Sequence, residues 1–221
     1  MTQVVLTEET IARLLHYRFL ANSFAYPDLE FARSLFADLA WDKLAANGQA
    51  LGLETAPIIA QMQEFIQSYG GDVKSLLTDL QIEYTYLFIS AVPHVPAPPY
   101  ESAYTGRGLL MGEPVSQVLQ AYREAGLLMN EDFDALPDHI AAEFEFVFYL
   151  VQQEAAASEE EIGAWRERQR RFLAQHLVRW GPEFLPKVQS SARKPFYRLL
   201  AALAQRWLDS EGERLPMTAQ S

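Results

Sequence analysis

The chain has no cysteine among its 221 residues. This absence excludes disulfides, thiolate metal ligands and cysteine nucleophiles, and it fits a reducing compartment. Long stretches without charge are also missing: the longest, residues 84–100, contains four prolines, so we expect no stable membrane insertion. No basic segment precedes the first apolar run, as it would in a secretory signal. We therefore expect a cytoplasmic protein.

Basic residues are scarce in the first two thirds of the chain. Residues 1–157 hold 21 acidic and 7 basic side chains, a balance of −14, whereas residues 158–221 hold 8 and 11, a balance of +3. A negative surface repels nucleic acid and attracts a cationic partner at long range. Ordinary solubility charge explains the same numbers. We expect no nucleic-acid partner, and a cationic ligand remains open.

Signals for β-structure are absent as well. No stretch alternates apolar and polar residues, and there is no hairpin dipeptide or internal repeat. Apolar residues recur at helical spacing instead, and a hydrophobic content of 49% is ample for one core. We predict an all-α fold: a single domain of about nine or ten helices over residues 1–212, followed by a disordered tail at 213–221.

The predicted helices are delimited by capping residues, prolines and glycines. Thr7 and Asp72 are expected N-caps, and Ser158 with Glu161 forms an expected capping box. The expected helical ranges are 7–25, 28–39, 41–50, 57–69, 72–88, 113–126, 136–151, 158–180, a short piece from 182, and 195–209.

The stretch LPDHIAAEFEFVFYLV at residues 136–151 is apolar on nearly every helical face. Such a helix is normally buried in the middle of a domain. Its first turn is polar, because Asp138 and His139 follow Pro137, a residue favoured at a helix start. We expect a buried helix whose polar end opens on a surface, where function is to be sought.

The long proline-rich loop, residues 90–112, contains four prolines and three glycines. It cannot continue a helix, and it is long for a plain connection, so we expect a functional loop. The segments on either side could exchange between two copies. We therefore expect a monomer or a domain-swapped dimer.

Motifs for metal, nucleotide and covalent chemistry find little support. His139 and Glu143, one helical turn apart, are the best local metal candidate, but no other histidine has an acidic partner at the spacing of helical di-iron proteins. The glycines at 106–112 are followed by Glu-Pro rather than the Lys-Ser or Lys-Thr of a P-loop. No serine lies in a nucleophile elbow. We expect neither a metal nor a cofactor.

Asp138 and His139 could act as a general acid and base, because histidine titrates near neutral pH and a carboxylate can orient its ring. Alternatively, Asp138 caps its own helix and His139 bonds a loop carbonyl. Tyr84, Leu87 and Phe88 are explained equally well as plain core residues. The residues alone leave these alternatives open.

Four short motifs together resemble the TorD/DmsD family of redox-enzyme maturation chaperones. They are Tyr84-Thr-Tyr-Leu87-Phe88, Pro98-Pro99-Tyr100-Glu101-Ser102-Ala103-Tyr104, Pro137-Asp138-His139 and Lys194-Pro195-Phe196-Tyr197-Arg198. The chain departs from the family pattern at Leu136, where members often carry glutamate, and at Glu101, where some members have a small residue. These departures leave the client preference open.

The resemblance implies an all-helical cytoplasmic chaperone that is not an enzyme. Such a chaperone binds the twin-arginine signal peptide of a molybdenum-containing oxidoreductase, assists cofactor insertion into the apoprotein and prevents premature export. We expect acidic groups to select the arginines and aromatic rings to line the apolar part. The signal-peptide-binding residues implied are Tyr84, Leu87, Phe88, Pro99, Tyr100, Glu101, Asp138 and His139.

Three alternatives remain beside this hypothesis. A nitrate-reductase-type assembly chaperone would serve a subunit that is not exported. A helical enzyme would use Asp138 and His139 on a small substrate. A structural adaptor would bind a folded partner through the basic C-terminal helices.

Overall fold

The computed structural model describes residues 6–105, 112–127 and 136–214. In these ranges the chain forms eleven α-helices and one π-helical segment, η1, and no strand beyond a single backbone bridge between Tyr100 and His139. The predicted all-α fold is confirmed. The elements are α1 Glu8–Phe24, α2 Leu29–Ser34, α3 Asp38–Ala50, α4 Ala56–Gln67, α5 Val73–Tyr84, η1 Thr85–Ile89, α6 Ser102–Thr105, α7 Glu113–Glu124, α8 Ile140–Ala156, α9 Glu159–Gln175, α10 Leu177–Ser191 and α11 Pro195–Arg214.

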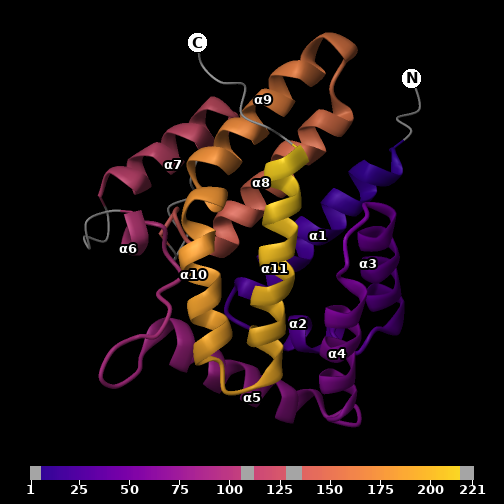
Figure 1. Ribbon diagram of the computed structural model, residues 1–221, viewed down its shortest axis with the longest axis vertical. Coiled ribbons are helices and arrows are strands. Elements are labelled where there is room, and N and C mark those ends of the chain that lie inside the picture. The colour runs from indigo at the N-terminus through magenta and orange to yellow at the C-terminus, as the bar shows by residue number, and fades with distance from the viewer. Residues whose placement is uncertain (1–5, 106–111, 128–135, 215–221) are drawn as a thin grey trace.

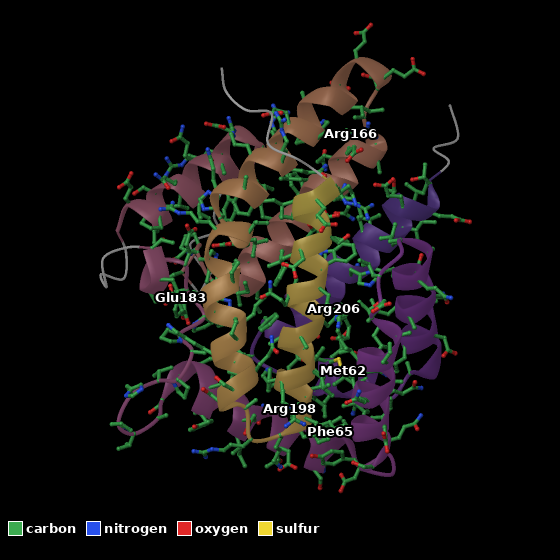
Figure 2. All side chains as sticks on the ribbon, in the orientation of Figure 1. Met62, Phe65, Arg166, Glu183, Arg198 and Arg206 are labelled. Atoms are coloured by element: carbon green, nitrogen blue, oxygen red, sulfur yellow. The ribbon has the colours of Figure 1, made fainter. Side chains whose placement is uncertain are left out.

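The helix α8 lies in the middle of the molecule, with α1 and α9 packed against it, and α10 and α11 lie side by side (Figure 1). Its Phe144 is fully buried and stacks on Phe24 of α1 at 5.9 Å between ring centroids. On the other side of the molecule α4 packs against α11 through the buried Met62, while Arg198 and Arg206 lie on the outer face of α11 (Figure 2). The predicted burial of the apolar central helix is confirmed.

The expected helix starts are confirmed at three caps. The Thr7 hydroxyl accepts from Thr10 N at 3.1 Å and the Asp72 carboxylate accepts from Ser75 N at 3.1 Å. Ser158 and Glu161 form the predicted capping box. Short polar side chains satisfy N–H groups that a helix start leaves free, which is why these boundaries can be read from sequence.

Several boundaries differ from the prediction, including the end of α2 at Ser34 and the span of α8 at Ile140–Ala156. The helix expected over 72–88 widens at Thr85 into the π-helical η1, where Ser90 N donates to Thr85 O at 2.8 Å. The helix expected over 158–180 breaks at His176, whose φ of −122° and ψ of −98° leave the helical region. The four-residue α6 within the proline-rich loop was not predicted. The unpredicted α6 raises the number of α-helices in the described residues to eleven. The last helix continues to Arg214, and the rest of the expected tail lies outside the described residues.

The expectation that the polar end of the central helix opens on a surface is wrong. The helix begins at Ile140, so Asp138 and His139 precede it, and their exposed fractions are 0% and 6%. The proline-rich loop covers them: Glu101 N donates to Asp138 O, and Ile140 N donates to Pro99 O, each at 2.9 Å. These backbone bonds hold the loop over the start of α8.

Candidate functional site

Three distant segments meet at the start of α8, and they carry all eight residues implied by the resemblance. We call this meeting of residues 84–89, which are the end of α5 and η1, loop residues 97–102 and residues 137–140 the junction. Besides the two bonds between the loop and α8, Ala97 N donates to Leu87 O at 3.0 Å and so ties the loop to η1. The fold therefore brings together residues that lie up to 55 positions apart in the sequence.

His139 is the N-cap of α8 and has both ring nitrogens engaged. Its Nδ1 accepts from Ala141 N at 3.1 Å, which leaves the proton on Nε2, 3.3 Å from the Tyr84 hydroxyl. The Tyr84 hydroxyl in turn donates to Phe24 O at 3.2 Å. Burial lowers the pKa of His139 to about 4. A neutral imidazole with both nitrogens occupied is poorly placed to act as a general base, and the interpretation in which Asp138 caps the helix is wrong, because His139 does so.

The two acidic residues of the junction point inward. Asp138 Oδ2 accepts from Ser102 N at 2.9 Å, and Glu101 Oε2 lies 2.6 Å from His176 Nδ1. Glu101 and Asp138 are both fully buried. Contact between either carboxyl group and an arginine of a ligand thus requires the loop to lift from α8. Their role in binding stays a prediction.

The aromatic residues of the junction form one cluster. The rings of Tyr84 and Phe88 lie 4.8 Å apart, and both contact Tyr197, at 6.0 and 5.5 Å. Tyr197 belongs to the fourth motif of the resemblance, so that motif lies in the same place. Tyr100, half-buried, packs its ring edge against His139 at 5.2 Å. Leu87 and Pro99 are also buried, and Leu87 belongs to the hydrophobic core.

Tyr26, which was not predicted as a site residue, connects this buried cluster with the surface. Its ring packs edge-on against Tyr84 at 5.3 Å while 53% of the residue is exposed. It follows the end of α1 and precedes Pro27, so it belongs to no apolar helical stripe. No periodicity could have found it.

Tyr26 also lies between two surface hollows, which we call together the Tyr26 groove. One, of about 370 Å³, runs along α5 and η1. The other, of about 410 Å³, runs along the end of α1 and the start of α2, and two acidic side chains and one basic side chain, Arg18, line it. The residues that carry the argument are Tyr26, shared by both, Ile82, Thr85 and Tyr86 in the first, and Asp28 and Glu30 in the second.

Exposed apolar side chains gather around this groove. Seven large hydrophobic residues are exposed in the described part of the chain; two of them line the groove, and three more lie within two residues of a lining residue in the sequence. These five are Tyr26, Leu29, Ile82, Ile89 and Val92. An exposed apolar patch beside acidic groups is typical of a binding surface. The arrangement suits a ligand with an apolar part and a positive charge.

Comparisons with known proteins identify the family. The family model described as "Nitrate reductase delta subunit" matches residues 49–185. The chain belongs to this family. Two relatives align over nearly their whole length: the perchlorate reductase assembly chaperone protein of Dechloromonas aromatica is 28% identical over 94% of this chain and 92% of its own, and chaperone protein TorD of Shewanella loihica is 29% identical over 92% and 93%.

A solved structure agrees with this assignment. A putative redox enzyme maturation protein from Archaeoglobus fulgidus superposes with a TM-score of 0.53 at 25% identity, over 95% of this chain and 97% of that one. The resemblance to the TorD family is confirmed. Within the nitrate reductase delta subunit family, the relatives are named as chaperones and assembly proteins rather than catalysts, so this chain is a chaperone of that kind and not an enzyme. None of its described helices has both the length and the apolar character needed to cross a membrane.

Proposed function

We propose that this protein is a cytoplasmic chaperone that binds the twin-arginine signal peptide of a molybdenum-containing oxidoreductase subunit. It holds the apo subunit while the cofactor is inserted and prevents premature export. The observation that carries the proposal is the Tyr26 groove, an apolar surface with acidic side chains at one end, placed directly over the junction. The assembly-chaperone relatives support the same class of client.

The apolar part of the leader would lie along α5 and η1, where Ile82 is 59% exposed and Tyr26 is 53% exposed. Covering roughly 300 Å² of apolar surface contributes up to about 7 or 8 kcal/mol before ordering costs. Ordering a flexible peptide costs several kcal/mol. The resulting affinity is micromolar or somewhat tighter.

The arginines of the leader would meet acidic groups in two stages. Asp28 and Glu30 line the exposed end of the groove and attract a cation first. Asp138, and with it Glu101, becomes accessible when the loop lifts from α8, and would then form charge-assisted hydrogen bonds. Tyr84, Phe88 and Tyr100 would line the apolar surface that this movement uncovers. Leu87, Pro99 and His139 hold those rings in place.

Calorimetric titration tests the proposal. The titrant is a synthetic twin-arginine leader, compared with the same peptide in which both arginines are glutamine. The native leader should bind with micromolar affinity, and the glutamine peptide should bind about 10- to 100-fold more weakly, because charge-assisted hydrogen bonds are lost. A protein that binds no leader of any co-encoded reductase would refute the function.

Variants place the site on the surface. Ile82→Ser should weaken leader binding about 10-fold without loss of stability, because the side chain is already exposed. Ile11→Ser is the matched control, an exposed isoleucine at the start of α1. Asp138→Ala should weaken binding in a salt-dependent way, whereas Asp209→Ala, an exposed acid of α11, should not. Equal affinities for Ile82→Ser and Ile11→Ser would remove the groove from the site and leave leader binding itself untouched.

The family model favours one second candidate, a nitrate-reductase-type chaperone whose client is not exported. The glutamine peptide separates the two. A chaperone that recognises its client without an arginine pair should bind the native and the glutamine peptide equally.

A further inference from the structure

Among the described residues, one group brings together side chains that could hold a metal ion: Glu101, Glu143 and His176. We call it the Glu101 chamber. Glu101 precedes α6, Glu143 lies on α8, and His176 lies at the break between α9 and α10. The ligand atoms all lie within 4.8 Å of one another, and the exposed fractions are 0%, 0% and 1%.

The chamber has more carboxyl groups than positive charge. Asp138 is also fully buried, and the charges of Glu101 and Asp138 both act on Glu143 and raise its pKa, with burial as the larger cause. Among the described residues, the carboxyl groups of Glu101, Asp138 and Glu143 have one basic side chain within ion-pair distance. It is His176, whose Nδ1 lies 2.6 Å from Glu101 Oε2. Buried carboxylates are strongly unfavourable unless a cation or a proton compensates them.

A buried acid elsewhere in the same fold shows what compensation looks like. Glu211, fully buried, accepts three hydrogen bonds from the Arg13 guanidinium and one from the Tyr17 hydroxyl. No arginine or lysine plays that part for Glu143 among the described residues. Glu211 and Glu143 are both buried, but among the described residues only Glu211 has an arginine as its partner.

Two oxygens at the chamber have no hydrogen-bond partner. Glu143 Oε2 accepts from Trp180 Nε1 at 3.0 Å, but Glu143 Oε1 is buried without a partner. Asp138 Oδ1 is likewise buried and unpartnered, although Ser102 N holds the other oxygen of that carboxyl group. Buried polar atoms in native proteins are nearly always satisfied, so each of these oxygens calls for a partner such as a water, a proton or a cation.

We propose that the Glu101 chamber binds one divalent first-row metal ion, with Glu101, Glu143 and His176 as ligands and Asp138 as an adjacent compensating charge. One imidazole with two carboxylates suits zinc or manganese, whereas calcium and magnesium prefer oxygen alone. Metal–ligand bonds of about 2.1 Å place opposite ligands about 4 Å apart, so small side-chain rotations from the present spacing suffice.

The ion would join the proline-rich loop, α8 and the α9–α10 break at a single point. Because Glu101 N is also bonded to Asp138 O, a metal at Glu101 would hold the loop down on the start of α8. Glu101 takes part in both proposals, but leader binding can be titrated on metal-free protein. Failure of one proposal thus leaves the other standing.

Metal analysis of the full chain, purified without a histidine tag, tests the proposal. Elemental mass spectrometry should find about one equivalent of zinc or manganese per chain. After removal of the metal by a chelator, Zn²⁺ at 100 times its dissociation constant should raise the melting temperature by about 5 to 10 °C. Wild-type protein that contains no metal and whose melting temperature Zn²⁺ does not change would overturn the proposal, and a proton would then be the occupant.

Single substitutions locate the ion. Glu143→Gln and His176→Gln should lose the bound metal and the zinc-dependent shift, whereas Glu183→Gln and His94→Gln, at exposed positions, should keep both. Equal metal content in all four variants would overturn the assignment. Where the buried variants do not fold, X-ray absorption at the zinc edge of the wild type decides instead: one imidazole with oxygen ligands is expected, and two or more imidazoles would contradict it.

Discussion

The buried ion pair between Arg13 and Glu211 joins the first long helix to the last, across 198 residues of sequence. Arg13 Nη2 lies 2.7 Å from Glu211 Oε2, Nε lies 3.1 and 3.2 Å from the two carboxylate oxygens, and the Tyr17 hydroxyl donates to Oε2 at 2.7 Å. The side chains are 6% and 0% exposed. Burial acts to lower the pKa of Arg13, but Glu211, together with Tyr17 and Glu154, outweighs it and raises the pKa. The guanidinium therefore stays charged.

Arg13→Met should destabilise the protein by about 3 to 5 kcal/mol, because it leaves the Glu211 carboxylate buried without its main cation. We expect the lower end of this range, since Arg214 Nε lies 3.4 Å from Glu211 Oε1 and offers partial compensation. Glu211→Leu should cost somewhat less, because the Arg13 guanidinium keeps Glu154 Oε2 as a partner at 3.6 Å. The double variant Arg13→Met/Glu211→Leu should lose much less stability than the sum of the two single losses, because it removes both members of the buried pair.

Urea unfolding of the four proteins gives the coupling energy. We expect at least about 2 kcal/mol, and Lys187→Met, which breaks an exposed pair with Glu183, should change stability by less than about 1 kcal/mol. Additive losses from Arg13→Met and Glu211→Leu would show that each acts through packing alone. The reasoning from buried charge would then be wrong.

Two further predictions concern Gly48 on α3 and His16 on α1. Gly48→Ala should destabilise the protein by about 1 to 3 kcal/mol in urea unfolding, because an added Cβ would lie 2.3 Å from Thr55 Oγ1. Adding Thr55→Ala to the same chain should recover most of this loss. A Gly48→Ala variant as stable as the wild type would contradict the close approach. Burial lowers the pKa of His16 to about 4, so between pH 6.5 and pH 4 the unfolded chain binds a proton that the folded His16 does not, which lowers the free energy of unfolding by about 3 kcal/mol on acidification. His139, whose pKa burial lowers in the same way, adds its own fall in the same range. His16→Gln should therefore remove about 3 kcal/mol of the pH dependence and leave the rest, and parallel pH profiles of the two proteins would contradict this.

Local chemistry made the helix starts predictable. Each cap interaction joins residues only three apart in the sequence, so the sequence contains both partners side by side. This holds for Thr7, Asp72 and the Ser158–Glu161 pair. The all-round apolar stretch of α8 likewise predicts its own burial. What failed was the direction of its polar end, because that depends on a loop about forty residues earlier, whose backbone bonds to Asp138 and Ile140 no local pattern reveals.

The candidate site shows the same limit. The four motifs of the resemblance meet at the junction, but the sequence could not say that Glu101 and Asp138 point inward. It could not find Tyr26, whose importance comes only from its contact with Tyr84. The metal candidate considered from sequence paired Glu143 with His139 by helical spacing, whereas the fold places Glu143 beside His176, on a different element.

The contact between the first and last helices bears on how this protein forms during synthesis. Until α11 leaves the ribosome, Arg13 has no Glu211, the His16 ring lacks Trp207, on which it stacks at 4.3 Å, and the face of α4 that packs on α11 remains uncovered. A chain stopped before residue 207 would therefore expose both a cation and an apolar surface that the finished protein hides. Chaperone activity should appear only after translation is complete, so a nascent copy cannot compete with the finished one for the client.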